Sequence, residues 1–388
     1  MKVYRMAELF CGPGGLGLGA MNASEKFSDQ KILPLWANDI HEETCETYAH
    51  NIHEGQGKIL YAPVEGSDFQ DNENHGTVIC GPVEELDFRK TPSFEGLSFG
   101  FPCNDFSIVG EQKGTDGEYG PLYTYGVKAL ETHGPVWFVA ENVGGLSSAN
   151  EGKAFGKILT DLENANRGYN LTVNLYKFEE YGVPQKRHRI VIVGIRKDLD
   201  LKFRVPAPTT PEPEQQKTAK QAIENPPIPD GHPNHIFTNQ SKTVVERLKH
   251  IPPGENAWYE GIPEEYRLNV KGARMSQIYR RLHPEEPAYT VTGSGGGGTH
   301  GYHWKEPRAL TNRERARLQT FPDEFIFQGT KGSIRRQIGM AVPVDGAEII
   351  FSALLKTLNQ ESYNYVEASF DHEELINTTD PDLEVVRV

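Results

Sequence analysis

A glycine-rich turn between an apolar segment and a helical one constrains the fold of this chain more than any other feature. Gly12, Gly14 and Gly17 follow the GxGxxG spacing directly after the apolar segment Met6–Phe10. Glycines there let the backbone turn tightly and approach a ligand closely. About 20 residues later a second apolar segment ends in Asp39, whose carboxylate can accept hydrogen bonds from ribose hydroxyls. The pattern predicts a nucleoside site in an α/β sheet, without identifying the nucleoside.

Apolar and helical stretches alternate up to about residue 200, which indicates βαβ units and a mostly parallel sheet. The predicted strands and first helices are Met6–Phe10, Leu33–Ala37, Leu97–Gly100, Val136–Ala140, Arg189–Ile195, Glu42–Asn51 and Gly152–Ala165. A proline-rich stretch, 205–213, predicts an extended linker. Residues 214–305 show little periodicity and are interpreted as an irregular second domain. Helices are predicted again at 311–321 and 347–358, and the acidic tail after Gln360 is expected to be partly disordered.

Composition narrows the class of protein. No segment approaches the roughly 20 consecutive apolar residues of a membrane helix. The N-terminus lacks the apolar region of a signal peptide, so we expect a cytoplasmic protein. The cysteines form no CxxC pair and have no histidines at the spacing of a zinc site, so no metal is expected. The four cysteines are Cys11, Cys45, Cys80 and Cys103.

Charge is distributed unevenly along the chain. The net charge of −14 by itself argues against a nucleic-acid partner. Residues 361–388, however, carry a net charge of −7, whereas residues 267–345 carry +6. A basic region on an acidic protein can bind a phosphate backbone locally, although a solvated charged face explains the same pattern.

A thiol, an acid and two cations follow or precede predicted strands. Cys103 comes shortly after one strand, Glu141 ends the next, and Arg187 and Arg189 lead into a third. The carboxyl ends of strands in open α/β sheets form the ligand crevice, so these groups are predicted to share one site. Separately, each is explained as core packing or a surface ion pair. Together they fit thiol attack at C6 of a pyrimidine, which makes C5 a nucleophile for the methyl group of S-adenosylmethionine.

The chain resembles the DNA (cytosine-5)-methyltransferases, chiefly those of bacterial restriction–modification systems. The resemblance implies a class I S-adenosylmethionine-dependent methyltransferase fold, which is α/β with a Rossmann-like mixed seven-stranded sheet, and a small irregular target-recognition domain. The motifs behind this resemblance span nearly the whole chain and occur in the same order as in the family. The motifs that carry it are Phe10–Gly15 (FCGPGG), Pro102-Cys103, Glu141–Val143 (ENV), Gln185–Arg189 (QKRHR), Arg308–Pro322 and Gly339–Pro343 (GMAVP).

Site roles follow from the resemblance. Cys103 is expected to be the nucleophile and Glu141 the acid at N3 of the cytosine, while Arg189 contacts the same base and Arg187 lies nearby. The residues expected to bind the cofactor are Phe10, Gly12, Gly14, Gly15, Leu16, Asp39, Ile40, Pro82, Pro102, Leu122, Ala341 and Val342. The residues expected to contact DNA are Ser107, Gln185, Arg274, Arg280, Arg281, Thr290, Ser294, Thr299 and His300.

The same resemblance divides the chain. Residues 1–204 are expected to form the catalytic domain with the cofactor and cytosine site, and residues 205–306 the target-recognition domain. Residues 307–360 would return to complete the catalytic domain, followed by an acidic tail at 361–388. The expected partner is double-stranded DNA, bound by a monomer with its target cytosine flipped out of the duplex. A restriction endonuclease acting separately is expected, with methylation protecting the host DNA.

Three positions depart from the family pattern. Asn104 follows the cysteine where glutamine is common, Met340 replaces the usual asparagine, and 81–83 (GPV) lacks the acid expected beside adenine. Three alternatives remain open. These are an RNA cytosine methyltransferase on the same scaffold, an adenine amino-methyltransferase, and a catalytically inactive DNA-binding protein. The second would need an aromatic residue that the segment Asn225–Ile228 (NPPI) lacks.

Overall fold

The computed structural model describes residues 1–69, 76–101, 122–144, 153–269, 275–293 and 298–377. The chain divides into two compact units. The sheet unit comprises Met1–Lys177, His188–Ala207 and Ala347–Val388, and the second unit comprises Phe178–Arg187 and Pro208–Gly346. Each unit has its own cluster of buried apolar side chains.

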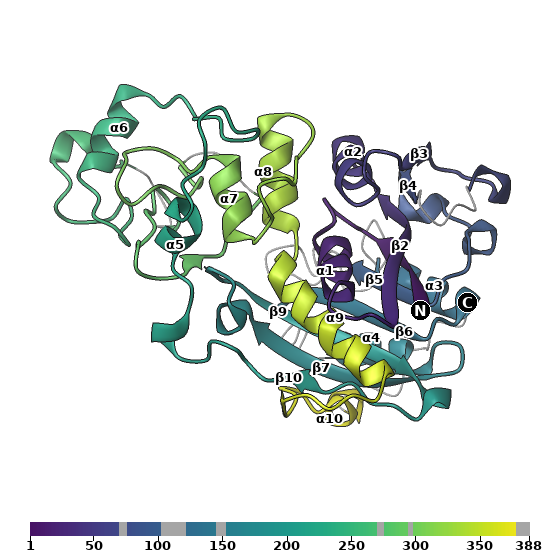
Figure 1. The fold of residues 1–388 in the computed structure, drawn as a ribbon. Helices are drawn as coiled ribbons and strands as arrows, with labels where there is room; N and C mark the ends of the chain where they lie inside the picture. The colour runs from purple at the N-terminus through teal and green to yellow at the C-terminus, as the bar shows by residue number, and fades with distance from the viewer. Residues whose placement is uncertain (70–75, 102–121, 145–152, 270–274, 294–297, 378–388) are drawn as a thin grey trace. The chain divides into compact units, whose positions relative to one another are not determined.

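The sheet unit is built on one mixed sheet of eight strands in the order β3-β4-β2-β1-β5-β6-β9-β7 (Figure 1). The predicted α/β class is confirmed, but the sheet has eight strands instead of seven, because β3 adds a short parallel strand at the edge beside β4. Only β9 runs antiparallel, to both of its neighbours. The strands are β1 (Lys2–Leu9), β2 (Gln30–Asp39), β3 (Lys58–Tyr61), β4 (Thr77–Cys80), β5 (Gly96–Gly100), β6 (Trp137–Val143), β7 (Tyr169–Lys177) and β9 (His188–Arg196).

The central strands are buried on both faces, as parallel strands between helices require. In β6 every residue but the last is buried. The helices of the sheet unit are α1 (Gly15–Ser24), α2 (Glu42–Asn51), α3 (Tyr123–His133), α4 (Lys153–Asn164), α10 (His372–Asn377) and most of α9 (Val344–Leu358). The sequence predicted β1, β2, β5, β6 and β9 near their observed positions but did not find β3, β4 or β7.

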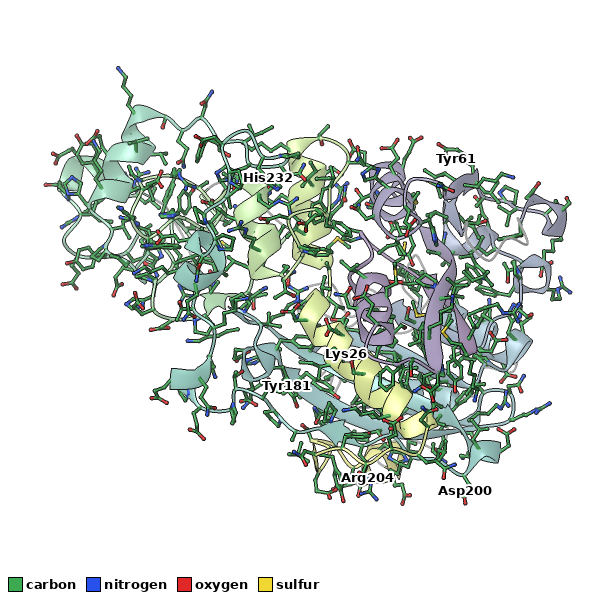
Figure 2. All side chains as sticks on the ribbon, viewed as in Figure 1. Lys26, Tyr61, Tyr181, Asp200, Arg204 and His232 are labelled. Carbon is green, nitrogen blue, oxygen red and sulfur yellow. The ribbon has the colours of Figure 1, made fainter. Side chains whose placement is uncertain are left out.

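Helix α9 lies beside α1 on one face of the sheet (Figure 1). Lys26, which Figure 2 labels next to α9, pairs with Glu348 at 2.5 Å. The ring of Phe351 packs edge-on against that of Trp137 in β6, with centroids 5.8 Å apart. Within the part of the chain that the structure describes, Lys331–Leu358 is the one helical stretch with the length and composition of a membrane span, and 72% of its most apolar window is buried inside the protein. Burial of that kind is typical of a core helix.

The acidic tail has regular structure in β12 (Tyr365–Val366) and α10 (His372–Asn377), and its last residues lie outside the described part of the chain, so partial disorder of the tail stays a prediction. Strand β12 pairs antiparallel with β10 (Val205–Pro206). Arg204, labelled in Figure 2, lies with its guanidinium 4.2 Å from the ring of Tyr365. Phe370 packs edge-on against Phe155 of α4, with centroids 6.0 Å apart. Apolar side chains spaced among the acids therefore hold the tail on the sheet unit.

The second unit is irregular, as the sequence predicted for much of it. Its elements are β8 (Gln185–Lys186), α5 (Ala219–Glu224), α6 (Lys242–Lys249), β11 (Ala288–Tyr289), α7 (Asn312–Leu318) and α8 (Lys331–Met340), joined by loops and 3-10 turns. Helix α7 begins with the predicted capping box, in which Thr311 Oγ1 accepts from the Glu314 amide at 3.2 Å and Glu314 Oε2 accepts from the Thr311 amide at 2.7 Å. Residues 307–346 lie in this unit.

Candidate active site

The carboxyl ends of five strands meet at one edge of the sheet. The parallel registers align Leu9 of β1 with Asn38 of β2 and with Phe99 of β5, and Asp39 with Cys80 of β4. Strand β6 continues the edge because Gly100 is in register with Glu141. Loops at this edge of an open α/β sheet form the ligand crevice. The structure therefore brings the predicted glycine turn, Asp39 and Glu141 to the same edge.

The glycine turn connects β1 to α1 and is fastened to the next strand by Asp39. Phe10, Gly12 and Gly14 all have positive φ, of 53°, 55° and 100°. The backbone amide of Gly12 donates to Asp39 Oδ2 at 3.0 Å, and the amide of His41 donates to Oδ1 at 3.0 Å. A carboxylate has further lone pairs on both oxygens, so Asp39 can accept from a ribose while holding the turn. Gly15 and Leu16 follow as the buried first residues of α1.

The ends of β2 and β4 form an adjoining surface. Asn38 donates from Nδ2 to the carbonyl oxygens of Ile79 and Gly81, each at 3.0 Å, and thereby joins the two strand ends. Pro82 follows as a half-buried residue, and its sequence neighbours Gly81 and Val83 carry no acidic side chain. Ile40, next to Asp39, is 59% exposed. An exposed apolar side chain beside a carboxylate suits the face of a purine.

The segment that contains Cys103 starts at the same edge. Asn142 donates from Nδ2 to the carbonyl oxygen of Phe101 at 2.9 Å, and this buried hydrogen bond joins the residue after β5 to β6. The residues predicted between there and α3, namely Pro102, Cys103 and Ser107, lie outside the described residues. Leu122, the predicted cofactor residue that caps α3, is partly buried against the core of the sheet unit.

Glu141 and Arg189 form an ion pair at this edge. Arg189 Nε lies 2.8 Å from Glu141 Oε1, and the two side chains are only 14% and 11% exposed. The contact is an ion pair without the geometry of a hydrogen bond, and Oε1 has no other partner among the described residues. Gly100 leaves room here, because a Cβ on it would lie 3.2 Å from Glu141 Oε2. A buried carboxyl oxygen with unused hydrogen-bonding capacity can bind a ligand that enters beside Gly100.

Glu8 in β1 is a buried acid that was not among the predicted site residues. Tyr48 donates its hydroxyl to Glu8 Oε2 at 3.1 Å, and a Cβ on Gly17 would come within 3.0 Å of that oxygen. Burial raises the pKa of Glu8 to about 8, and the nearby charge of Asp39 adds to the effect. Its signal in the sequence was an acid inside an apolar strand, which suggests a buried and partnered group.

Two predicted site residues in the second unit form hydrogen bonds within that unit. Arg187 is 1% exposed and donates to the carbonyl oxygens of Val291 at 3.2 Å and Gly339 at 3.1 Å. Gln185 is fully buried, accepts from the Val291 amide at 2.7 Å and donates to Gln319 Oε1 at 2.9 Å. Both side chains thus hold segments of the second unit together, and the expected roles of Arg187 near the cytosine and of Gln185 at DNA stay predictions. The predicted cofactor residues Ala341 and Val342 are buried in this unit.

The residues predicted to contact DNA fall into three groups. Arg281 is 6% exposed and donates to the carbonyl oxygens of Leu248, Ile251, His303 and Trp304, so it holds segments of the second unit together, and its contact with DNA stays a prediction. Arg280, Thr290, Thr299 and His300 are partly exposed. Arg274 and Ser294 lie outside the described residues.

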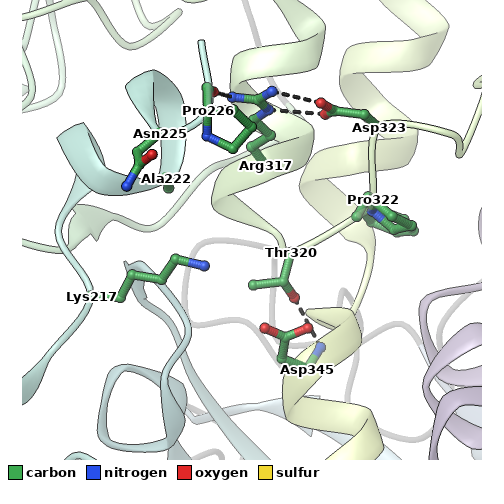
Figure 3. Close-up of a pocket in the computed structure, with 10 residues that line it drawn as sticks. Lys217, Ala222, Asn225, Pro226, Arg317, Thr320, Pro322, Asp323 and Asp345 are labelled. Carbon is green, nitrogen blue, oxygen red and sulfur yellow. Dashed lines mark hydrogen bonds and ion pairs between the residues drawn. The ribbon is translucent and has the colours of Figure 1, made fainter. Parts of the chain in front are cut away.

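A separate cavity of about 270 Å³ lies in the second unit and is shown in Figure 3. Arg317 and Asp323 on its wall pair with each other at 2.6 Å, and Thr320 Oγ1 accepts from the Asp345 amide at 2.9 Å. The charges of Arg317 and Asp323 thus neutralise each other on the wall, and none of the predicted site residues lines the cavity. No group of three or more potential metal ligands occurs in the described parts of the chain.

Comparison with known proteins agrees with this arrangement. The model of the C-5 cytosine-specific DNA methylase family matches residues 4–356. The chain belongs to the C-5 cytosine-specific DNA methylases. It is 56% identical to the Type II methyltransferase M.BbvI of Brevibacillus brevis, over 95% of this chain and 96% of that protein. It is 40% identical to the Type II methyltransferase M.NgoFVII of Neisseria gonorrhoeae, over 96% of this chain and 91% of that protein. This methylase is a cytosine-5 DNA methyltransferase of the restriction–modification type.

Solved structures support the fold of the methylase. A crystal structure named as a DNA modification methyltransferase encoded within an Escherichia coli prophage superposes with a TM-score of 0.67 at 22% identity, covering 92% of this chain and 99% of that one. A mutant of DNMT2 from Spodoptera frugiperda superposes with a TM-score of 0.57 at 15% identity, again over 92% and 99%. At these identities the likeness concerns the fold.

Proposed function

We propose that this methylase transfers the methyl group of S-adenosylmethionine to C5 of a flipped-out cytosine in a specific duplex sequence, through a covalent bond between Cys103 and C6. The observation that carries the proposal is the ion pair of Glu141 and Arg189 at the strand edge where the Cys103 segment begins. An acid and a cation in a largely buried site suit a polar heterocycle better than a hydrocarbon ligand.

The chemistry assigns one task to each group. The Cys103 thiolate attacks C6, which breaks the C5–C6 π bond, removes the aromaticity of the ring and leaves an electron-rich C5. Glu141 holds N3 and supplies a proton or hydrogen bond there, so that negative charge on the ring is stabilised. Arg189 orients Glu141 and contacts the base. After methyl transfer a base removes the C5 proton, the electron pair re-forms the C5–C6 double bond, and the thiolate leaves.

The glycine turn and Asp39 fit the cofactor. S-adenosylmethionine supplies the electrophilic methyl group when bound. Asp39 would accept hydrogen bonds from the ribose hydroxyls. The backbone amides of the turn beside Gly12 would lie along the methionine part, and Phe10 and Ile40 would pack on the adenine. The positive φ values of the turn and the exposed Ile40 side chain support this assignment. Pro82, Pro102, Leu122, Ala341 and Val342 are proposed as further cofactor contacts.

The biological setting follows from the family. We propose a cytoplasmic monomer that protects host DNA from a separately acting restriction endonuclease. The second unit would read the target sequence, with residues 205–306 as the recognition domain. Arg280, Thr290, Thr299 and His300 are its proposed DNA-contacting residues in the described part, together with Ser107, Arg274 and Ser294 outside it.

The test uses tritiated S-adenosylmethionine and genomic DNA that lacks cytosine methylation, followed by bisulfite sequencing. We expect label in DNA and protected cytosines within one short motif. A Cys103→Ser protein, assayed in parallel, is the matched control for the covalent step. Label in RNA instead, or label in DNA without protected cytosines, would contradict the proposal. The same outcome from Cys103→Ser as from the native protein would contradict the covalent step alone.

A further inference from the structure

A cluster of cations lies between α7 and α8 in the second unit. Arg315 of α7 donates to the carbonyl oxygen of His300, and Arg335 of α8 has Nη1 3.3 Å from Nδ1 of the same histidine. Lys331, at the first turn of α8, donates to the carbonyl oxygen of Phe237 at 2.8 Å. Helices α7 and α8 pack against each other, so these groups belong to one local surface.

Ion pairs neutralise the arginines on either side of Arg315, whereas in the described part of the chain Arg315 and Lys331 lack such a pair. Arg308 and Arg317, on either side of Arg315 in the sequence, pair with Glu314 at 2.7 Å and Asp323 at 2.6 Å. Among the described residues, Arg315 and Lys331 form no ion pair with an aspartate or glutamate. Arg315 is only 4% exposed, and its buried Nε has no hydrogen-bond acceptor in the described structure.

The positive charges of the cluster also lower the pKa values of neighbouring groups within it. Burial, together with the charges of Arg335, Arg315 and Lys331, lowers the pKa of His300 to about 4. Burial and the same two arginines lower the pKa of Lys331. His300 is therefore neutral near pH 7, and because a guanidinium only donates, its Nδ1 accepts from Arg335 and its proton resides on Nε2. An anion bound here would reduce the mutual repulsion and would meet a further donor on the imidazole.

Backbone groups extend the cluster. Helix α8 begins at Lys331 after the N-cap Thr330, whose Oγ1 accepts from the Ser333 amide at 3.2 Å, and a helix N-terminus favours anions. The backbone of Gly293 packs directly on α8, since a Cβ on Gly339 would lie 1.9 Å from the Gly293 nitrogen. Gly293 thus lies directly beside α8.

We propose that Arg315, Lys331, Arg335 and His300 bind a phosphodiester group of the DNA substrate. The inference rests on the proposed function, because it takes the polyanion to be DNA. Side chains of this kind contact phosphates without reading base sequence, and they fix the position of a recognition domain on the duplex. The site would therefore contribute to affinity equally for target and non-target sequences, while base readout belongs to other residues.

The test measures binding of a fluorescein-labelled, unmethylated duplex of 30 base pairs to the full-length protein between about 50 and 200 mM NaCl, the window in which salt dependence reports phosphate contacts. The variants are Lys331→Gln and Arg335→Gln. Lys249→Gln on α6 removes the same charge from a lysine that pairs with Glu246 at 2.7 Å, and serves as the matched control. Lys331→Arg keeps the charge and is the conservative rescue. Thermal unfolding and binding of S-adenosylhomocysteine establish that each variant is folded.

We expect each of the two glutamine variants to weaken binding about tenfold, as loss of a charged hydrogen bond does, and to reduce the slope of log K against log salt by about 1. Lys249→Gln and Lys331→Arg should keep the native slope. An unchanged slope in folded Lys331→Gln and Arg335→Gln would overturn the proposal. If those variants keep their DNA affinity but lose thermal stabilisation by inorganic phosphate, the site takes free phosphate and the DNA assignment is wrong.

Failure of this site and failure of the proposed function can be told apart. Methyl transfer to cytosine by the native protein, combined with unchanged DNA-binding slopes in the variants, overturns the phosphate site and leaves the function standing. Absence of transfer by the native protein, combined with the expected slope changes, overturns the function and leaves a DNA-phosphate site.

Discussion

Replacing Glu141 by glutamine tests the proposed chemistry at one atom. The substitution keeps the size and shape of the side chain but removes its charge and its ability to donate a proton from oxygen. Glu141 Oε1 lies 2.8 Å from Arg189 Nε and has no other partner among the described residues, so the oxygen is available to the substrate. Loss of a general acid or base lowers a rate by about 10² to 10⁴. We expect the slower methyl-transfer step to correspond to at least about 2.7 kcal/mol of additional barrier.

The stability effect of Glu141→Gln should be small by comparison. Breaking a fully buried ion pair by removing one partner costs about 3–5 kcal/mol. Here both side chains keep some exposure, and Arg189 still donates to the carbonyl oxygen of His188 at 2.7 Å, so we expect a smaller loss. Glu163→Gln, which breaks a surface pair with Lys197 at 3.1 Å, is the matched control.

The assay is a single-turnover measurement at saturating DNA and cofactor, because it isolates methyl transfer from binding and product release. Glu141→Gln should transfer the methyl group at least about a hundredfold more slowly than Glu163→Gln. DNA and S-adenosylhomocysteine affinities, measured separately, should remain near those of the native protein. A single-turnover rate within threefold of native in a folded variant would refute the role of Glu141 in the chemistry.

Three further predictions follow from the site. Cys103→Ser should abolish turnover while DNA binding in gel-shift titrations persists, and measurable turnover would exclude the covalent step. Asp39→Asn should weaken S-adenosylhomocysteine binding about tenfold or more in calorimetry, because an amide cannot accept from both the Gly12 and His41 amides, and native affinity would contradict this. Because the pKa of Glu8 is raised from 4.5 to about 8, native stability should fall as pH rises from 5 to 8. Glu8→Gln should remove that fall in thermal unfolding, and parallel curves for the two proteins would show that Glu8 is not the cause.

The local pattern of the sequence was sufficient to predict the sheet edge that carries the glycine turn and Asp39. The GxGxxG turn, Asp39 and the apolar strands around them follow from short-range rules of backbone conformation and periodicity. The capping box at Thr311 was readable for the same reason, since both partners are three residues apart. The edge strands β3 and β4 escaped prediction because each has only four residues, too few to establish a period.

The partners of buried charges were decided only by the tertiary structure. Arg187, Arg281 and Arg315 look alike in the sequence, and all three donate to backbone carbonyl oxygens in the structure. Only Arg315 among these three lies in the cluster of cations with Lys331 and Arg335. Glu8 likewise acquires its raised pKa from burial, and its hydrogen-bond partner Tyr48, which opposes that effect, is 40 residues away along the chain. A charged side chain carries no sequence signal for what will surround it, because desolvation and hydrogen bonding depend on segments that folding brings together.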